Sequence, residues 1–293
     1  MKWSRKKFKS KKRKDTERKK RTIAGVSLLV GIAALIIGTS YLSALEGVTI
    51  DTIVVEGNEV IDAEDIERVA RQEMSGRYLW LYARSNALIY PRKHVRRAIQ
   101  DEFLRIRDIR IELDSMDLLR ILVTEREPYG IWCGTEFSNE IAPENEECSF
   151  VDVDGVIYAS APSFSGDVFL RMYGEQKNNH FSTKEDFKEI RRLFNLLESE
   201  EIKPTVAVLR ESDTLEVTVD DLFGHTSVLF VDLETSPEET VRNLLTLYSE
   251  LTSVRGENRT DPHLEYVDLR FGNRVFYNLM EEDSFTAPST SVQ

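Results

Sequence analysis

Side chains capable of catalysis or metal binding are scattered along this chain and form no recognisable catalytic motif. The four histidines, His94, His180, His225 and His263, lie in separate segments, and their spacing matches no zinc motif. The sequence also lacks the glycine-rich signatures that bind phosphates or dinucleotides and the G-x-S-x-G signature of serine hydrolases. We therefore expect a non-enzymatic protein with no catalytic residue, no metal ligand and no cofactor.

An acidic motif, Asp152-x-Asp154-Gly155, resembles the start of a calcium-binding loop. Such a loop needs a bidentate glutamate at its twelfth position. That position falls on Ser163 or on Ala161, depending on where counting begins, so neither frame supplies the ligand. Asp-Gly between alternating apolar residues is instead typical of a β-hairpin turn, which is the structure we predict here.

The two cysteines, Cys133 and Cys148, are 15 residues apart and flank a polar, acidic segment. In an oxidising compartment such a pair often forms a disulfide, and closing a loop of this length would contribute about 3 kcal/mol. Two unpaired thiols are the alternative.

Aromatic and arginine side chains gather in the last predicted hairpin, around Gly272-Asn273. These residue types are enriched at binding hot spots, and a terminal strand offers an edge to which a partner strand can pair. The alternative is that the aromatic rings face the core and the arginines pair with local acids. The residues concerned are Tyr266, Arg270, Phe271, Arg274, Phe276 and Tyr277.

The elements that would position these residues form two units of an α+β protein. Apolar periodicity predicts a first unit of order β-α-α-β-β, two helices on one face of a three-stranded sheet. Its strands are expected at 48–55, 106–113 and 119–123, and its helices at 63–73, after an Asp62 cap, and from Pro91 to Phe103. The apolar stretch 78–82 is expected to pack beneath a loop.

The second predicted unit is strand-rich with two flanking helices. Strands are expected at 129–133, 150–153, 206–209, 215–219, 227–231, 264–270 and 275–279. Thr183 is expected to cap a helix that extends to about Glu198, and Pro237 to open the other. The polar residues 281–293 read as a disordered tail.

The N-terminal region predicts a membrane anchor. Residues 1–21 contain 13 Lys or Arg and two acids, although the whole chain has a net charge of −12. Residues 22–45 contain no charged residue, and as a helix they would span about 36 Å, enough for a hydrocarbon core of ~30 Å. A buried helix usually has a polar face, and the apolar region of a cleaved signal peptide is usually shorter.

The charge distribution also predicts the orientation of this anchor. Lys and Arg beside a membrane helix stay on the cytoplasmic side, so we expect residues 1–21 inside and residues 46–293 outside. The basic segment then faces anionic lipid headgroups, and binding to nucleic acid is not expected.

Four short segments behind the apolar region, in this order, resemble the bacterial cell-division family FtsQ, called DivIB in Gram-positive bacteria. They are I-V-V-E-G-N at 53–58, L-x-I-x-V-x-E-R-E-P at 119–128, V-D-x-D-G-V-I at 151–157, and V-D-L-R-F at 267–271. Trp132 adds to the likeness. The chain departs from the family pattern at Gly130, usually Ala, in the acidic loop 135–147, and at 161–164, which only partly resembles an L-P-x-L segment.

The resemblance implies a domain order for the whole chain. By this resemblance the chain comprises a basic cytoplasmic tail (1–21), a transmembrane helix (22–45), a POTRA domain (46–126), an FtsQ-type β domain (127–280) and a disordered tail (281–293). The implied location is the plasma (inner) membrane at the division site.

The resemblance also implies a role in the divisome and a set of contact residues. The protein would hold FtsB- and FtsL-type single-pass proteins by β-strand addition, and through them the FtsW–FtsI synthase of septal peptidoglycan. Two alternatives stay open, a POTRA-bearing chaperone of secretion or envelope assembly and an anchored cell-wall hydrolase. Carried over by position, the contact residues are Arg270, Phe271, Asn273, Val275 and Tyr277.

Overall fold

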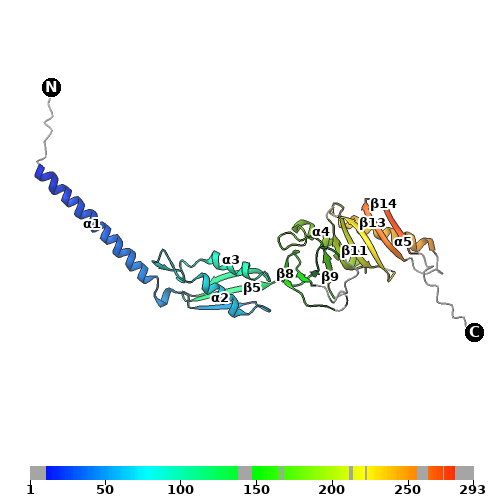
Figure 1. Ribbon diagram of the computed structural model, residues 1–293, viewed down its shortest axis with the longest axis horizontal. Helices are drawn as coiled ribbons and strands as arrows, with labels where there is room; N and C mark the ends of the chain where they lie inside the picture. The colour runs from blue at the N-terminus through cyan, green and yellow to red at the C-terminus, as the bar shows by residue number, and fades with distance from the viewer. Residues whose placement is uncertain are drawn as a thin grey trace, which may run out of the picture. The chain divides into compact units, whose positions relative to one another are not determined.

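The computed structural model shows a mixed α/β protein with one N-terminal apolar helix and a large sheet (Figure 1). It describes residues 11–137, 147–164, 166, 168–210, 214–221, 223–255, 263–272 and 274–280. The chain divides into two compact units, residues 1–125 and 126–293. The expected free tail, most of the acidic loop and Asn273 lie outside the described residues.

The N-terminal helix α1 (Lys11–Leu42) continues from the basic segment into the apolar one. Its stretch from Arg18 to Leu42 is long and apolar enough to cross a membrane, and none of its most apolar window is buried within the protein. These properties fit a membrane anchor and fit a signal sequence equally well. They exclude the core helix of a soluble domain, which would be buried.

The first unit contains a three-stranded sheet with two helices, in the expected order along the chain. Strand β5 (Leu118–Glu125) lies in the centre, parallel to β1 (Thr52–Glu56) and antiparallel to β4 (Ile106–Leu113). Helices α2 (Ala63–Glu73) and α3 (Arg92–Glu102) bury their apolar faces in the same core as the sheet. The fully buried residues of this core include Ile66, Val95, Ile99, Ile109, Leu119 and Ile121.

One local prediction for this unit is confirmed only in part, and another is wrong. Asp62 occupies the N-cap of α2, but its side chain makes no capping hydrogen bond. The stretch 78–82 does not pack beneath a loop: it belongs to a small hairpin of β2 (Arg77–Tyr78) and β3 (Tyr82–Ala83). The side chains of Leu79 and Trp80 at its tip are 87% and 90% exposed.

Glu125, at the end of β5, joins the two ends of the chain segment that forms the first unit. Its Oε1 accepts hydrogen bonds from the backbone N–H groups of Glu59, Val60 and Ile61, at 2.8, 3.0 and 3.0 Å. Burial opposes ionisation, but these three donors and the charge of Arg105 hold the pKa of Glu125 below its ordinary value. The E-R-E-P segment thus begins with a structural carboxylate.

We expect the stabilisation by Glu125 to depend on pH. Its folded-state pKa is lowered, so its contribution is complete above the unfolded-state value of about 4.3 and is lost as the pH falls through the folded-state value. The difference in unfolding free energy between wild type and Glu125→Gln should therefore shrink between neutral and acidic pH. Urea unfolding of both proteins across this range measures it. A difference that stays constant would contradict a stabilising role for the three hydrogen bonds that the Glu125 carboxylate accepts, which we call the Glu125 clamp.

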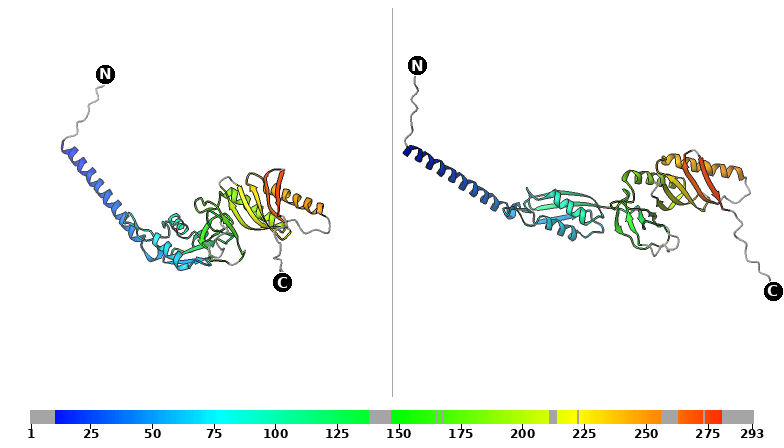
Figure 2. Two further views of the ribbon diagram at one scale, coloured as in Figure 1. Left: turned by 45° about the vertical axis from the view of Figure 1, so that its right-hand side comes forward. Right: turned by 45° about the horizontal axis from the view of Figure 1, so that its top comes forward.

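The second unit is built on one nine-stranded mixed sheet, in the order β14-β13-β12-β11-β10-β9-β6-β7-β8. Helices α4 (Lys184–Ser199) and α5 (Pro237–Arg255) pack against one of its faces (Figure 2). Thr183 caps α4 as expected, accepting a hydrogen bond from the N–H of Asp186 at 3.2 Å. The strands are β6 (Gly130–Trp132), β7 (Ser149–Val151), β8 (Ile157–Ser160), β9 (Leu170–Tyr173), β10 (Lys203–Leu209), β11 (Thr214–Asp220), β12 (Thr226–Asp232), β13 (Leu264–Phe271) and β14 (Arg274–Leu279).

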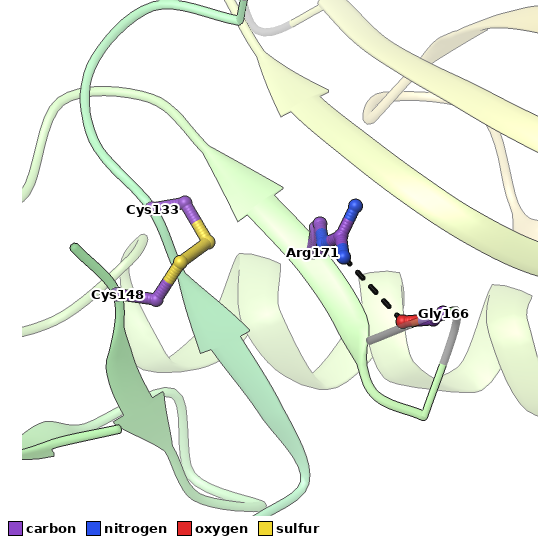
Figure 3. Close-up of a disulfide and its surroundings, with 4 residues drawn as sticks. All are labelled: Cys133, Cys148, Gly166 and Arg171. Carbon is purple, nitrogen blue, oxygen red and sulfur yellow. Dashed lines mark hydrogen bonds between the residues drawn. A yellow bond between two sulfur atoms is a disulfide. The ribbon is translucent and has the colours of Figure 1, made fainter. Parts of the chain in front are cut away.

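Strand β9 was not expected from the sequence, yet it connects the two halves of this sheet. It pairs in parallel with β10 on one side and with β6 on the other. The strand has only four residues, one of them Arg171, which is buried and donates to the carbonyl of Gly166 at 3.4 Å (Figure 3). A short run with a central charge has no clear alternation, so no local signal marks it as a strand.

The structure joins Cys133 and Cys148 in a disulfide (Figure 3). Cys133 follows β6 and Cys148 precedes β7, and these neighbouring strands are antiparallel. The bond therefore closes the end of this ladder, with its two Cα atoms 4.2 Å apart.

Removing this disulfide is expected to lower the unfolding free energy by about 3 kcal/mol, since the unfolded chain gains the freedom of a 15-residue loop. Urea unfolding of the Cys133→Ala/Cys148→Ala protein measures the loss. Reductant should destabilise the wild type to the same extent and leave the double variant unchanged. Equal midpoints for oxidised wild type and variant would contradict the expectation.

Candidate functional site

The C-terminal hairpin, β13 and β14, forms one end of the large sheet. Strand β13 pairs with β12 in parallel, and β14 pairs with β13 in an antiparallel ladder. Among the described strands, β14 pairs with no other strand, so its outer edge presents unpaired N–H and C=O groups. This edge is the feature that the sequence singled out as a candidate binding site.

The ladder registers divide the candidate residues between the two faces of the sheet. Phe276 lies opposite Asp268, on the face away from the helices, whereas Tyr277 lies opposite the core residue Val267. Val275 packs against the core from the helix-covered side. The side chains at the edge remain open to solvent: Phe276 is 52% and Tyr277 42% exposed.

Arg270 is held in place by Asp268, two residues earlier on β13. Its Nη2 and Nε lie 2.6 and 2.9 Å from the two carboxylate oxygens of Asp268, in a bidentate pair. The hydrogen bonds from Arg270 lower the pKa of Asp268 against the opposing effect of burial. Asp268 is only 8% exposed, so the pair holds the guanidinium of Arg270 against the surface of the sheet.

Aromatic rings surround this guanidinium on the open face of the sheet. The Arg270 Cζ lies 5.4 Å from the ring centroid of Phe230 and 5.8 Å from that of Phe271. The rings of Phe271 and Phe276 meet edge to face at 5.4 Å. The alternative interpretation of the sequence is therefore correct for Arg270, which pairs with a local acid. It is not correct for Phe271 and Phe276, whose rings stay exposed and do not face the core. We call Arg270, Phe271, Phe276 and Tyr277, with the β14 edge, the terminal patch.

Helix α5 positions the turn of this hairpin. The side-chain amide of Asn243 donates to the carbonyl of Gly272 at 2.7 Å, and Gly272 itself has a left-handed backbone with φ of 60°. This contact joins residues 29 positions apart, and no local pattern in the sequence indicates it. Asn273, the fifth residue carried over from the resemblance, lies outside the described residues.

The Asp152 motif is a structural turn. Asp152 Oδ1 accepts hydrogen bonds from the N–H groups of Asp154 and Val156, both at 2.9 Å, and its Oδ2 pairs with Arg126. Gly155 has φ of 78°, and a Cβ there would lie 2.7 Å from Cγ of Phe187. The side chain of Asp152 therefore organises the hairpin between β7 and β8, as the Asp-Gly signal predicts.

The histidines remain largely apart in the fold. His225 and His263 stack at 4.3 Å between ring centroids, at the end of the sheet away from Gly272. Among the residues that the structure describes, no three His, Cys, Asp or Glu side chains converge on a point that could hold a metal ion.

Comparison with known proteins does not identify a relative. No family model matches the sequence, and no curated protein matches it.

Proposed function

We propose that this protein is a membrane-anchored scaffold of the bacterial divisome, of the FtsQ/DivIB type. In this proposal α1 is a retained anchor, residues 1–21 are cytoplasmic, and the two folded units lie outside the plasma membrane. The protein has no enzymatic role. It holds FtsB- and FtsL-type single-pass proteins and through them supports the FtsW–FtsI synthase of septal peptidoglycan.

The observation that carries the proposal is the open edge of β14. Strand addition needs a row of unpaired backbone groups together with side chains that set the register of the incoming strand. The terminal patch offers both, since exposed Phe271, Phe276 and Tyr277 border the edge. Arg270, fixed by Asp268, adds a cation beside these rings. Large aromatic residues and arginine are the usual anchors of such interfaces.

The first unit and the motifs of the sequence support the same proposal. A three-stranded sheet with two helices, in the order strand, helix, helix, strand, strand, agrees with the POTRA domain that the resemblance implies. The Cys133–Cys148 disulfide is consistent with an oxidising location for the second unit.

Fluorescence microscopy of the full chain, fused at its N-terminus to a fluorescent protein, tests the proposal. In dividing cells of the native host we expect a band at midcell. A fusion that lacks residues 264–293 keeps the anchor and the first unit and should fail to retain the FtsB-type partner at midcell. Uniform envelope fluorescence of the full-length fusion throughout the cell cycle would contradict a divisome role.

A further inference from the structure

The hairpin of β2 and β3 exposes apolar side chains in a way that the fold itself does not require. Leu79 and Trp80 have left-handed backbones, with φ of 49° and 61°, which bulky residues rarely adopt. Both side chains point into solvent and are 87% and 90% exposed. A strained backbone that displays a tryptophan and a leucine suggests a function outside the core of this unit.

Hydrogen bonds fix this hairpin to the C-terminal end of α1. The carbonyl of Leu81 accepts a hydrogen bond from Ser40, and the hydroxyls of Thr39 and Tyr82 lie 3.1 Å apart. Ser43 Oγ accepts from the N–H of Ala83 at 3.3 Å. Asn86, which is buried, adds a hydrogen bond to the carbonyl of Ser43 at 3.0 Å. The tip therefore cannot move independently of the last turn of the helix.

The position of these contacts along α1 sets their depth in a bilayer. Residues 22–45 would span about 36 Å as a helix, longer than a hydrocarbon core of about 30 Å. The last turn, from Thr39 to Ser43, then lies where hydrocarbon gives way to headgroups. A hairpin attached to that turn lies at the same level.

The residues around the tip match the composition of a membrane interface. Tyr and Trp concentrate at this level, where an apolar ring and a polar atom are both accommodated. Leu88 and Ile89, beyond the hairpin, are 72% and 42% exposed. Arg84 lies over the ring of Tyr78, with its Cζ 5.6 Å from the centroid, and its Nη2 lies 3.8 Å from the carboxylate of Glu73.

We propose that Leu79 and Trp80 insert into the outer leaflet of the bilayer that α1 spans, at the level of the headgroups and upper acyl chains. The inference rests on the proposed function only in requiring α1 to be a retained anchor. The molecules that cover Leu79 and Trp80 are lipids, because the tip of the hairpin adjoins the apolar surface of α1. Insertion would tie the first unit to the membrane surface at a second point and restrict its rotation about the anchor.

Quenching of tryptophan fluorescence in the full chain tests this proposal. The protein is reconstituted into vesicles of phosphatidylethanolamine and phosphatidylglycerol, with or without bromine on the upper acyl chains. The background variant Trp3→Phe retains Trp80 and Trp132, and the further change Trp80→Phe allows the contribution of Trp80 to be obtained by difference. Resistance to carbonate extraction shows separately that α1 is inserted.

We expect the brominated lipid to quench at least half of the Trp80 signal, and acrylamide in the water to quench it several-fold less than it quenches free tryptophan. Leu79→Glu should restore access of acrylamide to Trp80. Val60→Glu, which adds the same charge at a side chain 64% exposed elsewhere in this unit, should not.

Three results would overturn the proposal. Trp80 could be quenched freely by acrylamide and not by bromine although α1 is inserted, which would leave the anchor intact and place the tip in water. Trp80 could be shielded from both quenchers, which would indicate cover by protein, such as a second copy. Release of the chain by carbonate would instead contradict the anchor, and with it the proposed function.

Discussion

Proline at Phe276 and proline at Tyr277 are expected to have opposite consequences, and one of them should weaken binding of an FtsB-type partner by about 100-fold or more. Successive residues of a strand direct their N–H groups to opposite edges, so one of these two positions donates to β13 and the other to the open edge. Proline removes the donor in either case. The variant that loses the outer N–H stays folded and fails to bind, whereas the other loses part of the β13 ladder.

Two measurements separate these outcomes: thermal unfolding of each variant, and capture of the host's FtsB-type protein by the purified full chain in detergent. Phe276→Ala and Tyr277→Ala serve as matched controls, since both keep the N–H while removing the exposed ring. A folded variant that lacks the outer N–H and still binds as tightly as wild type would contradict strand addition at β14.

Replacing Asp152 with alanine is expected to lower the unfolding free energy of the second unit by about 3–5 kcal/mol. The change removes the acceptor of two turn amides and the carboxylate that pairs with Arg126, whose side chain is only 16% exposed. Asp152 itself is 1% exposed, so water cannot replace it without rearrangement. Urea unfolding, monitored by fluorescence of Trp132, measures the loss.

The variant Asp152→Asn separates the contribution of the turn hydrogen bonds from that of the ion pair with Arg126. The amide oxygen can still accept from the N–H groups of Asp154 and Val156, but the charge opposite Arg126 is gone. We expect a loss intermediate between wild type and Asp152→Ala. Glu175→Ala, at an exposed carboxylate of the same unit, should change stability by less than about 0.5 kcal/mol. Equal stability of wild type and Asp152→Ala would contradict the role of this turn.

The local elements of the fold were predictable because their signals are local. Helix α2 has the expected bounds, and the alternating Ile109, Ile111, Leu119 and Ile121 mark β4 and β5 as strands with one buried face. The Asp-Gly turn at 154–155 was identified for the same reason. Each of these features is determined by the types and spacing of a few consecutive residues.

The features that were missed depend on residues far apart in the sequence. Strand β9 is defined by its neighbours β6 and β10, and the Glu125 clamp joins residues more than 60 positions apart. The stretch 78–82 was misjudged because its composition resembles a core segment. Its exposure becomes clear only from the left-handed turn at Leu79 and Trp80 and from the contacts with α1.

The candidate site was predictable as a region but not in its details. Aromatic residues with arginine in a terminal hairpin indicated an interface, and the sheet order leaves the outer edge of β14 open. The sequence could not show that Arg270 is already paired with Asp268, or that Phe276 rather than Tyr277 lies on the face away from the helices. The first fact depends on side-chain conformations within β13, and the second on the register between β13 and β14.

Photo-crosslinking from the β14 edge in living cells identifies the protein that lies against this strand. A photoreactive phenylalanine analogue replaces Tyr277, which is 42% exposed, and in a control protein it replaces the exposed Glu175. Strand addition at β14 predicts one dominant product from position 277 that contains a short single-pass division protein, and none of it from position 175. Products at position 277 that match those at 175, or that contain only cytosolic proteins, would contradict it.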